Sequence, residues 1–204
     1  MLNHAEDNEA RLVGNICSNL EYSHAVLGES FYKVCVCSER LSENEDEIIV
    51  TISERLIQDI ELDIGTRVEV IGQFRSYNNY SGEGSRLILT LFAREINITD
   101  DECDNEIYLN GYICKPAIFR TTPFGREIAD ILLAVNRAYG KSDYIPCIAW
   151  GRNAKFCEHL SVGSNLRIKG RMQSRKYQKK LDDETVVEKT AYEVSVSKLE
   201  CLED

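Results

Sequence analysis

The sequence lacks the features that mark membrane, secreted and zinc-binding proteins. It contains no apolar run of membrane-spanning length, and its acidic first nine residues lack the apolar core of a secretion signal. It has no C-x-x-C pair and only three histidines, so we expect no zinc site. We therefore expect its eight cysteines to be free thiols in a reducing compartment, most of them packed as small core residues.

Basic residues are scarce in the first half of the chain, and this hides a basic region in the second half. Residues 1–100 hold 8 Lys+Arg against 18 Asp+Glu, whereas residues 101–204 hold 16 of each. Within residues 105–180 the count is 14 basic against 5 acidic. The net charge of −10 therefore does not exclude a nucleic-acid partner for the second half, although a solvated surface explains a charge cluster equally well.

An internal repeat, offset by 97 to 98 residues, divides the chain. Leu12–Cys17 (LVGNIC) recurs as Leu109–Cys114 (LNGYIC), and Asp63–Gly72 recurs as Ser161–Gly170. This period suits two copies of one small domain. We place the first domain at residues 1–98, a polar linker at 99–105 and the second domain at 106–204.

Each copy contains five stretches with the alternation of a β-strand and one short amphipathic helix. We expect helices at residues 54–60 and 153–160, between the third and fourth strands, and a hairpin tip near residues 182–184. This order predicts an all-β fold of two tandem five-stranded barrels of the oligonucleotide-binding (OB) type. The ten expected strands are residues 11–18, 30–38, 46–53, 66–75, 86–96, 106–114, 126–138, 143–150, 165–177 and 186–197.

The strand at residues 143–150 carries two large rings. Alternation places Tyr144 and Trp150 on one face together with Pro146 and Ile148, and we expect that face to be exposed. Pro146 cannot donate to a ladder, which predicts an unpaired side at a barrel opening. Nucleobases could stack on the exposed rings, but a protein partner or a second subunit would cover them equally well.

With these residues, the second half resembles bacterial single-stranded DNA-binding protein. The matching segments occur in the right order and spacing between Glu106 and Leu199, and they include Phe119–Gly125, Ala134–Tyr139, Asp143–Gly151 and Ser174–Tyr177. The resemblance implies a non-enzymatic protein without a cofactor, which binds and protects single strands with little sequence preference in replication, recombination or repair. It also implies a bacterial, cytoplasmic and nucleoid-associated location.

The resemblance assigns base stacking to Tyr139, Tyr144, Trp150 and Tyr177. Tyr177 shares a strand face with Arg171 and Arg175, a composition that suits a groove for single strands. The candidate phosphate contacts are the basic residues Arg126, Arg137, Arg152, Lys155, Arg171, Arg175 and Lys176.

Two departures from the family bear on partners. Two copies per chain imply a homodimer that supplies four domains. The sequence closes with Leu199–Asp204 instead of the family's acidic tail and hydrophobic tip, so we do not expect recruitment of repair enzymes by that route.

The first copy is expected to bind DNA weakly or not at all. Aligning its third strand places Ile48 opposite Tyr144, and Glu54 or a gap opposite Trp150. A carboxylate near the phosphate track would repel DNA. The alternative is a protein-interaction barrel in which the rings form interface hot spots. An enzyme ranks third, since we find no nucleophile–base set, no paired carboxylates and no metal cluster.

Overall fold

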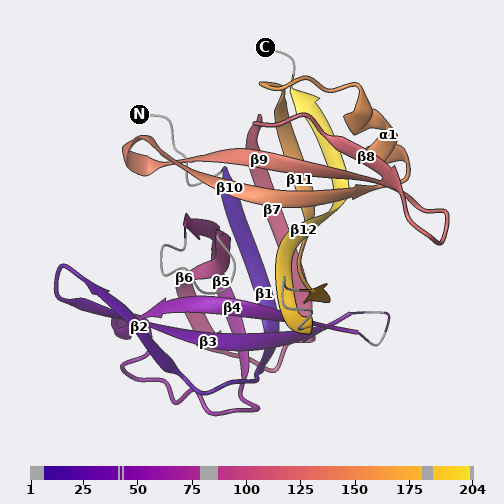
Figure 1. The fold of residues 1–204 in the computed structure, drawn as a ribbon. Coiled ribbons are helices and arrows are strands. Elements are labelled where there is room, and N and C mark those ends of the chain that lie inside the picture. Colours follow the sequence, from indigo (N-terminus) through magenta and orange to yellow (C-terminus); the bar gives the residue numbers. More distant parts are fainter. Residues whose placement is uncertain (1–6, 41, 43, 79–86, 181–185, 203–204) are drawn as a thin grey trace.

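The computed structural model describes residues 7–40, 42, 44–78, 87–180 and 186–202, and these residues are mostly β-strand (Figure 1). The helical segments are η1 (Glu54–Leu56), η2 (Ala138–Gly140) and α1 (Arg152–Glu158). The strands are β1 (Asn8–Ile16), β2 (Glu21–Val26), β3 (Glu29–Glu39), β4 (Glu45–Ser53), β5 (Arg67–Asn78), β6 (Leu87–Ile98), β7 (Asp104–Ile113), β8 (Ile118–Thr121), β9 (Glu127–Arg137), β10 (Lys141–Trp150), β11 (Asn165–Lys180) and β12 (Val186–Leu202).

The strand pairings repeat from the first half of the chain to the second. In the N-terminal strand set (β1–β6), neighbouring strands pair in the order β1-β3-β4-β6-β5, and β5 pairs with β1, which closes a ring. Only the β4–β6 pairing within this ring is parallel. In the C-terminal strand set (β7–β12), β7-β9-β10-β12-β11 returns to β7, with β10–β12 parallel. β2 pairs with β3 and β8 with β9 outside these rings.

The two strand sets are joined through their first strands. β1 and β7 pair antiparallel from Asn8↔Leu109 to Val13↔Asp104. They lie between the two sets in Figure 1, and the long β11–β12 hairpin reaches from the C-terminal set down to the N-terminal set. Buried apolar residues of both sets form one continuous core.

The glycines of the internal repeat allow strands to approach closely. A Cβ at Gly14 would lie 2.3 Å from the carbonyl oxygen of Cys37, and one at Gly111 would lie 2.6 Å from that of Ala134. These are the places where β1 meets β3 and β7 meets β9. Any side chain would push these strands apart, which explains why glycine recurs at this point of both copies.

The ten predicted strands all overlap observed strands, but β2 and β8 were not predicted. The β2–β3 turn uses two residues with positive φ, Leu27 (49°) and Gly28 (83°). Leucine is a poor signal for such a turn, because asparagine, aspartate and glycine usually occupy it. The expected tip at residues 182–184 lies outside the described residues.

One of the two predicted helices is correct in place and type. α1 covers most of residues 153–160, but the helix predicted over residues 54–60 is wrong, because only the three-residue 3-10 turn η1 forms there. The β-branched side chains of Ile57 and Ile60 disfavour a helix at this place. None of the helices in the described ranges is long and apolar enough to cross a membrane.

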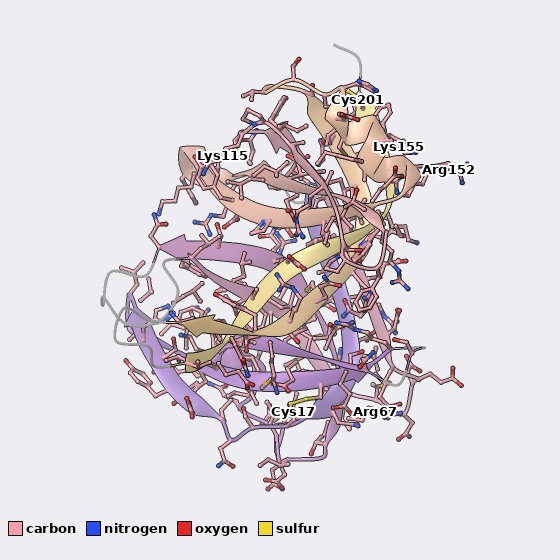
Figure 2. All side chains as sticks on the ribbon, turned by 45° about the vertical axis from the view of Figure 1, so that its right-hand side comes forward. Cys17, Arg67, Lys115, Arg152, Lys155 and Cys201 are labelled. Carbon is pink, nitrogen blue, oxygen red and sulfur yellow. A yellow bond between two sulfur atoms is a disulfide. The ribbon has the colours of Figure 1, made fainter. Side chains whose placement is uncertain are left out.

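The expectation that every cysteine is a free thiol is also wrong. Cys17 and Cys37 form a disulfide, with their Cα atoms 6.0 Å apart (Figure 2). The pairing of Asn15 with Cys37 brings the end of β1 beside β3 and so places Cys17 within bonding reach. The other six cysteines are free.

Candidate nucleic-acid interface

Three of the four predicted stacking rings are exposed on the C-terminal strand set. Tyr139 is 97% exposed at the tip of the β9–β10 hairpin, where its backbone adopts a left-handed conformation (φ 62°). Tyr144 on β10 is 47% exposed, and Tyr177 on β11 is 37% exposed. The guanidinium carbon of Arg175 lies 5.8 Å from the centre of the Tyr177 ring, so a cation accompanies this ring as the sequence predicted.

The fourth ring is partly covered, and the prediction of a fully exposed face on β10 is wrong. Trp150 is half-buried, and its Nε1 donates a hydrogen bond to Ser195 Oγ at 3.2 Å. Ile148, between the two rings on the same face, is buried. The strand is therefore open at its Tyr144 end and partly closed at its Trp150 end. Strand alternation fixes which residues share a face, but it does not show what packs on that face.

Phe124 and Tyr77 are examples of exposed rings that were not among the predicted contacts. Phe124 is 92% exposed in the turn between β8 and β9. Tyr77, from the N-terminal strand set, is exposed beside Arg137, whose guanidinium carbon lies 6.0 Å from the ring centre. A bulky apolar residue at a turn was the signal for Phe124, whereas the Tyr77 contact depends on how the two strand sets pack.

Three predicted phosphate contacts gather near the end of β10 that carries Trp150. Arg126 precedes β9, while Arg152 and Lys155 project from α1 (Figure 2). Arg126 and Arg152 are exposed and have no ion-pair partner among the described side chains. Lys155 Nζ lies 3.1 Å from Glu127, but its side chain is mostly exposed.

The other four predicted phosphate contacts are paired with carboxylates. Each of these cations lies within an ion-pair distance of an acid from its own strand set or from the other one. The pairs are Arg137 with Asp143 (3.5 Å), Arg171 with Asp46 (2.7 Å), Arg175 with Glu193 (3.8 Å) and Lys176 with Glu47 (2.7 Å).

Asp143 fixes the start of β10 against the N-terminal strand set. Its Oδ1 accepts a hydrogen bond from the backbone N–H of Ser76 at 2.8 Å, and Ser76 Oγ accepts one from the N–H of Tyr144 at 2.7 Å. Burial raises the pKa of Asp143, and the Ser76 N–H and Arg137 only partly offset this effect. Tyr144 is therefore held on a rigid backbone while its ring stays exposed.

Asp46 of the N-terminal strand set makes the corresponding contacts with the C-terminal strand set. Its Oδ1 accepts a hydrogen bond from the N–H of Ser174 at 3.1 Å, and Ser174 Oγ accepts one from the N–H of Glu47 at 2.9 Å. Asp46 and Asp143 are 97 residues apart, the offset of the repeat. These matching contacts make Glu47 the counterpart of Tyr144.

The sequence alignment of the two third strands is therefore wrong by one residue. It placed Ile48 opposite Tyr144, but Ile48 is fully buried and Tyr144 is exposed. With the aspartates aligned, Ser53 and not Glu54 matches Trp150. The alignment failed because the shared anchor is a single carboxylate, which apolar alternation does not detect.

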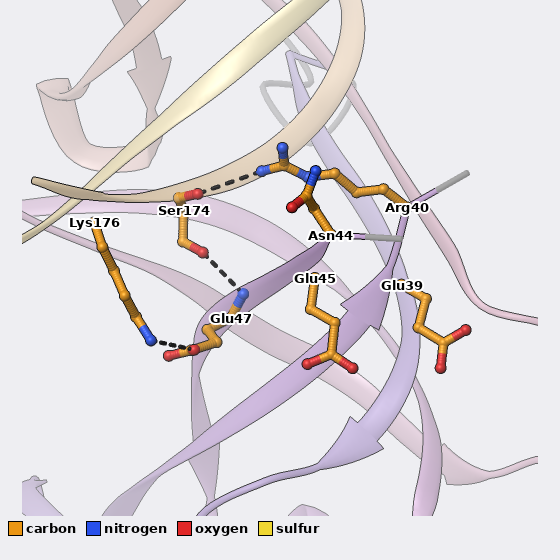
Figure 3. A pocket seen from close by; sticks show the side chains of 7 residues that line it. All are labelled: Glu39, Arg40, Asn44, Glu45, Glu47, Ser174 and Lys176. Carbon is orange, nitrogen blue, oxygen red and sulfur yellow. Dashed lines mark hydrogen bonds and ion pairs between the residues drawn. The ribbon is translucent and has the colours of Figure 1, made fainter. Parts of the chain in front are cut away.

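The surface of the N-terminal strand set that corresponds to the exposed rings is acidic. Glu47 occupies the Tyr144 position and pairs with Lys176 from the β11–β12 hairpin. A pocket of about 830 Å³ opens at this junction (Figure 3). It carries three carboxylates against two cations and is lined by Glu39, Arg40, Asn44, Glu45, Glu47, Ser174 and Lys176.

The fold and these open rings beside cations are typical of all-β proteins that stack nucleic-acid bases on aromatic side chains. Residues 104–202 match the model of the single-strand binding protein family. This segment contains β7–β12, and thus all of the predicted stacking rings.

Curated relatives match the same half of the chain. Single-stranded DNA-binding protein 1 of Staphylococcus aureus is 37% identical over 81 residues, which is 36% of this chain and 48% of that protein. Single-stranded DNA-binding protein A of Bacillus subtilis is 35% identical over 81 residues, 36% of this chain and 47% of that protein. The chain thus spans about half the length of the curated relatives it matches.

A solved structure resembles nearly the whole chain. The wild-type single-stranded DNA-binding protein of Thermus aquaticus has a TM-score of 0.77 at 18% identity, over 97% of this chain and 93% of that one. At this identity the likeness is one of fold, and it extends to the N-terminal strand set, which the family model does not match.

Proposed function

We propose that the chain binds single-stranded DNA with little sequence preference, as a binding protein without catalytic activity or cofactor. The observation that carries the proposal is the family match over residues 104–202, because the exposed rings lie within that segment. The curated relatives are named for the same activity. Such a protein would protect single strands during replication, recombination or repair in the bacterial cytoplasm, at the nucleoid.

The mechanism combines stacking with charge neutralisation. Bases stack on Tyr139, Tyr144 and Tyr177, each contributing about 1–3 kcal/mol. Trp150 offers only its uncovered part, since its side chain is half-buried and its Nε1 is bonded to Ser195. Phosphates are neutralised first by Arg126 and Arg152 near the end of β10. The five carboxylate-paired cations, Lys155 among them, contribute only where DNA displaces the acid.

We further propose that the chain folds as two tandem five-stranded OB barrels, residues 1–98 and 106–204, joined by residues 99–105. The repeated pairing order and the likeness to the Thermus aquaticus protein support this division. A homodimer would then supply four barrels. The N-terminal barrel binds DNA weakly or not at all, because Glu47 replaces a stacking ring and the surrounding pocket is acidic.

The test is a titration of the full chain with poly-dT, followed by the fluorescence of Trp150, the only tryptophan. We expect quenching that saturates at a fixed number of nucleotides per chain. Tyr144→Ala should weaken binding by about 1–3 kcal/mol. Tyr22→Ala is the control, because Tyr22 is even more open to solvent than Tyr144 (63% against 47% exposed) but lies on β2 of the N-terminal strand set.

Two results would contradict the proposal. One is the absence of saturable binding at low salt, which would leave the rings to a protein partner. The other is equal weakening by Tyr144→Ala and Tyr22→Ala, which would mean that the exposed ring on β10 has no special role.

A further inference from the structure

Three cysteine sulfurs meet on the outside of the N-terminal strand set. Cys35 and Cys37 lie two residues apart on β3, on the face opposite the buried Val34 and Val36, and Cys17 directly follows β1. Their Sγ atoms all lie within 4.8 Å of one another. The backbone N–H of Cys17 donates a hydrogen bond to the carbonyl oxygen of Cys35 at 2.9 Å, so the backbone holds the group together.

We propose that these three cysteines, once reduced, form a site for a thiophilic divalent cation of the zinc and cadmium class. Thiolate sulfur is a preferred ligand of such ions, and a Zn–S bond of about 2.3 Å places the sulfurs of a tetrahedral site roughly 3.8 Å apart. Cys35 Sγ therefore has at most about 1 Å to close toward each of the other two sulfurs, while Cys17 Sγ and Cys37 Sγ must move apart after reduction from the S–S bonding distance of about 2.05 Å. Cys17 is exposed, so solvent can supply the fourth ligand.

The site and the disulfide are alternative states of the same sulfurs. A dithiol reductant converts the Cys17–Cys37 disulfide to two thiols and is itself oxidised to a disulfide. The cation then binds the three thiolates and releases three protons. Because Cys17 and Cys37 are joined in the oxidised state, only Cys35 can then act as a ligand, and we expect cation binding to be lost.

The C-terminal strand set supplies an internal comparison. Cys114 is the repeat counterpart of Cys17, and its backbone N–H donates to the carbonyl oxygen of Leu132 at 3.1 Å, as that of Cys17 does to Cys35. Leu132 and Ala134 stand where the N-terminal set has Cys35 and Cys37. The same backbone arrangement therefore carries one sulfur in one set and three in the other, which makes Cys114→Ser a matched control.

The experiment is a cadmium titration of the full chain, reduced without oxygen and freed of reductant, followed by the ultraviolet absorbance of thiolate-to-cadmium charge transfer. We expect saturation at one cation per chain with the signal of three thiolates. Cys35→Ser should remove about a third of that signal and weaken binding at least tenfold, since even changes outside the ligand set cost ~10–100-fold. Cys114→Ser should leave both values unchanged.

The oxidised chain should give no comparable signal until a dithiol is added. The proposal is overturned if the reduced chain shows no charge-transfer band, or if Cys114→Ser reduces the band as much as Cys35→Ser does. A circular dichroism spectrum of each variant checks that the strands are intact, so that a lost signal reports the ligand and not unfolding.

Discussion

Asp46 is the most enclosed charge at the junction of the two strand sets. It is 1% exposed, and it accepts hydrogen bonds from Arg40 Nε (2.8 Å), Arg171 Nη1 (2.7 Å) and the N–H of Ser174. Two guanidinium groups thus depend on a single carboxylate. Removing that carboxylate would leave them partly buried without a counter-charge.

Asp46→Ala should therefore destabilise the chain by about 3–5 kcal/mol. The measurement is the urea midpoint followed by circular dichroism. Glu45→Ala is the control, because Glu45 is the exposed carboxylate next to Asp46 on β4, and it should cost under about 0.5 kcal/mol. Equal effects of the two substitutions would show that Asp46 is not the anchor.

The stability that Asp143 contributes depends on pH, and the dependence is opposite in direction to that of a carboxylate in a surface ion pair. Because its pKa is raised in the folded state, the folded chain binds more protons than the unfolded chain between the ordinary pKa of 3.8 and the raised value. The contribution of Asp143 to stability is thus greatest below pH 3.8 and decreases as pH rises through the raised value.

Asp143→Asn should consequently gain stability relative to the unmutated chain as pH rises across this window. Asparagine keeps an oxygen for the Ser76 N–H but carries no charge to desolvate. Urea midpoints of both chains at a series of pH values measure the difference. A difference that shifts in favour of the unmutated chain with rising pH would mean that the ion pair with Arg137 outweighs the cost of burial.

At the scale of elements, a steric constraint lies where the first strand of each set crosses its neighbour. Gly111→Ala should destabilise the chain by about 1–3 kcal/mol, because the new Cβ would lie 2.6 Å from the Ala134 carbonyl oxygen. Thermal unfolding measures this cost. Glu9→Ala on β1 places an alanine at an exposed site and should have little effect. If Gly111→Ala were equally harmless, the crossing would not need glycine.

The sequence predicts the elements better than it predicts their surroundings. Apolar alternation identified ten strands, because inward residues such as Leu109 and Ile145 repeat with period two. It could not identify β2, which is largely exposed and has no inward face to mark it. It also could not show that Ile148 is buried and Trp150 half-covered, since these depend on neighbours distant in the sequence.

The candidate site was predictable only in part, because some of its contacts also depend on residues distant in the sequence. The resemblance selected four rings, and the structure leaves three of them open to solvent (Tyr139, Tyr144 and Tyr177) and half-buries Trp150. Whether Arg171 and Lys176 contact phosphate stays a prediction, because both pair with acids of the N-terminal strand set. No local pattern reveals such partners, which lie over a hundred residues away in the chain.

For the whole molecule, the acidic N-terminal half should not prevent salt-dependent binding by the basic half. Each neutralised phosphate adds about −0.7 to the slope of log affinity against log salt. Replacing Arg126, Arg152 and Lys155 by alanine should therefore reduce the slope by roughly 2. Arg94→Ala, an exposed cation of the N-terminal strand set, should leave it unchanged. Equal losses in both variants would indicate a diffuse field and not a defined track.

The most direct measurement is ultraviolet cross-linking of the full chain to oligo-dT, with the cross-linked residues identified by mass spectrometry. Stacked bases react with the rings they touch, so we predict cross-links at Tyr139, Tyr144 and Tyr177, with few or none on β2 and β3. Cross-links concentrated at Tyr22 and Tyr32 of the N-terminal strand set, or spread evenly over all exposed rings, would contradict the account.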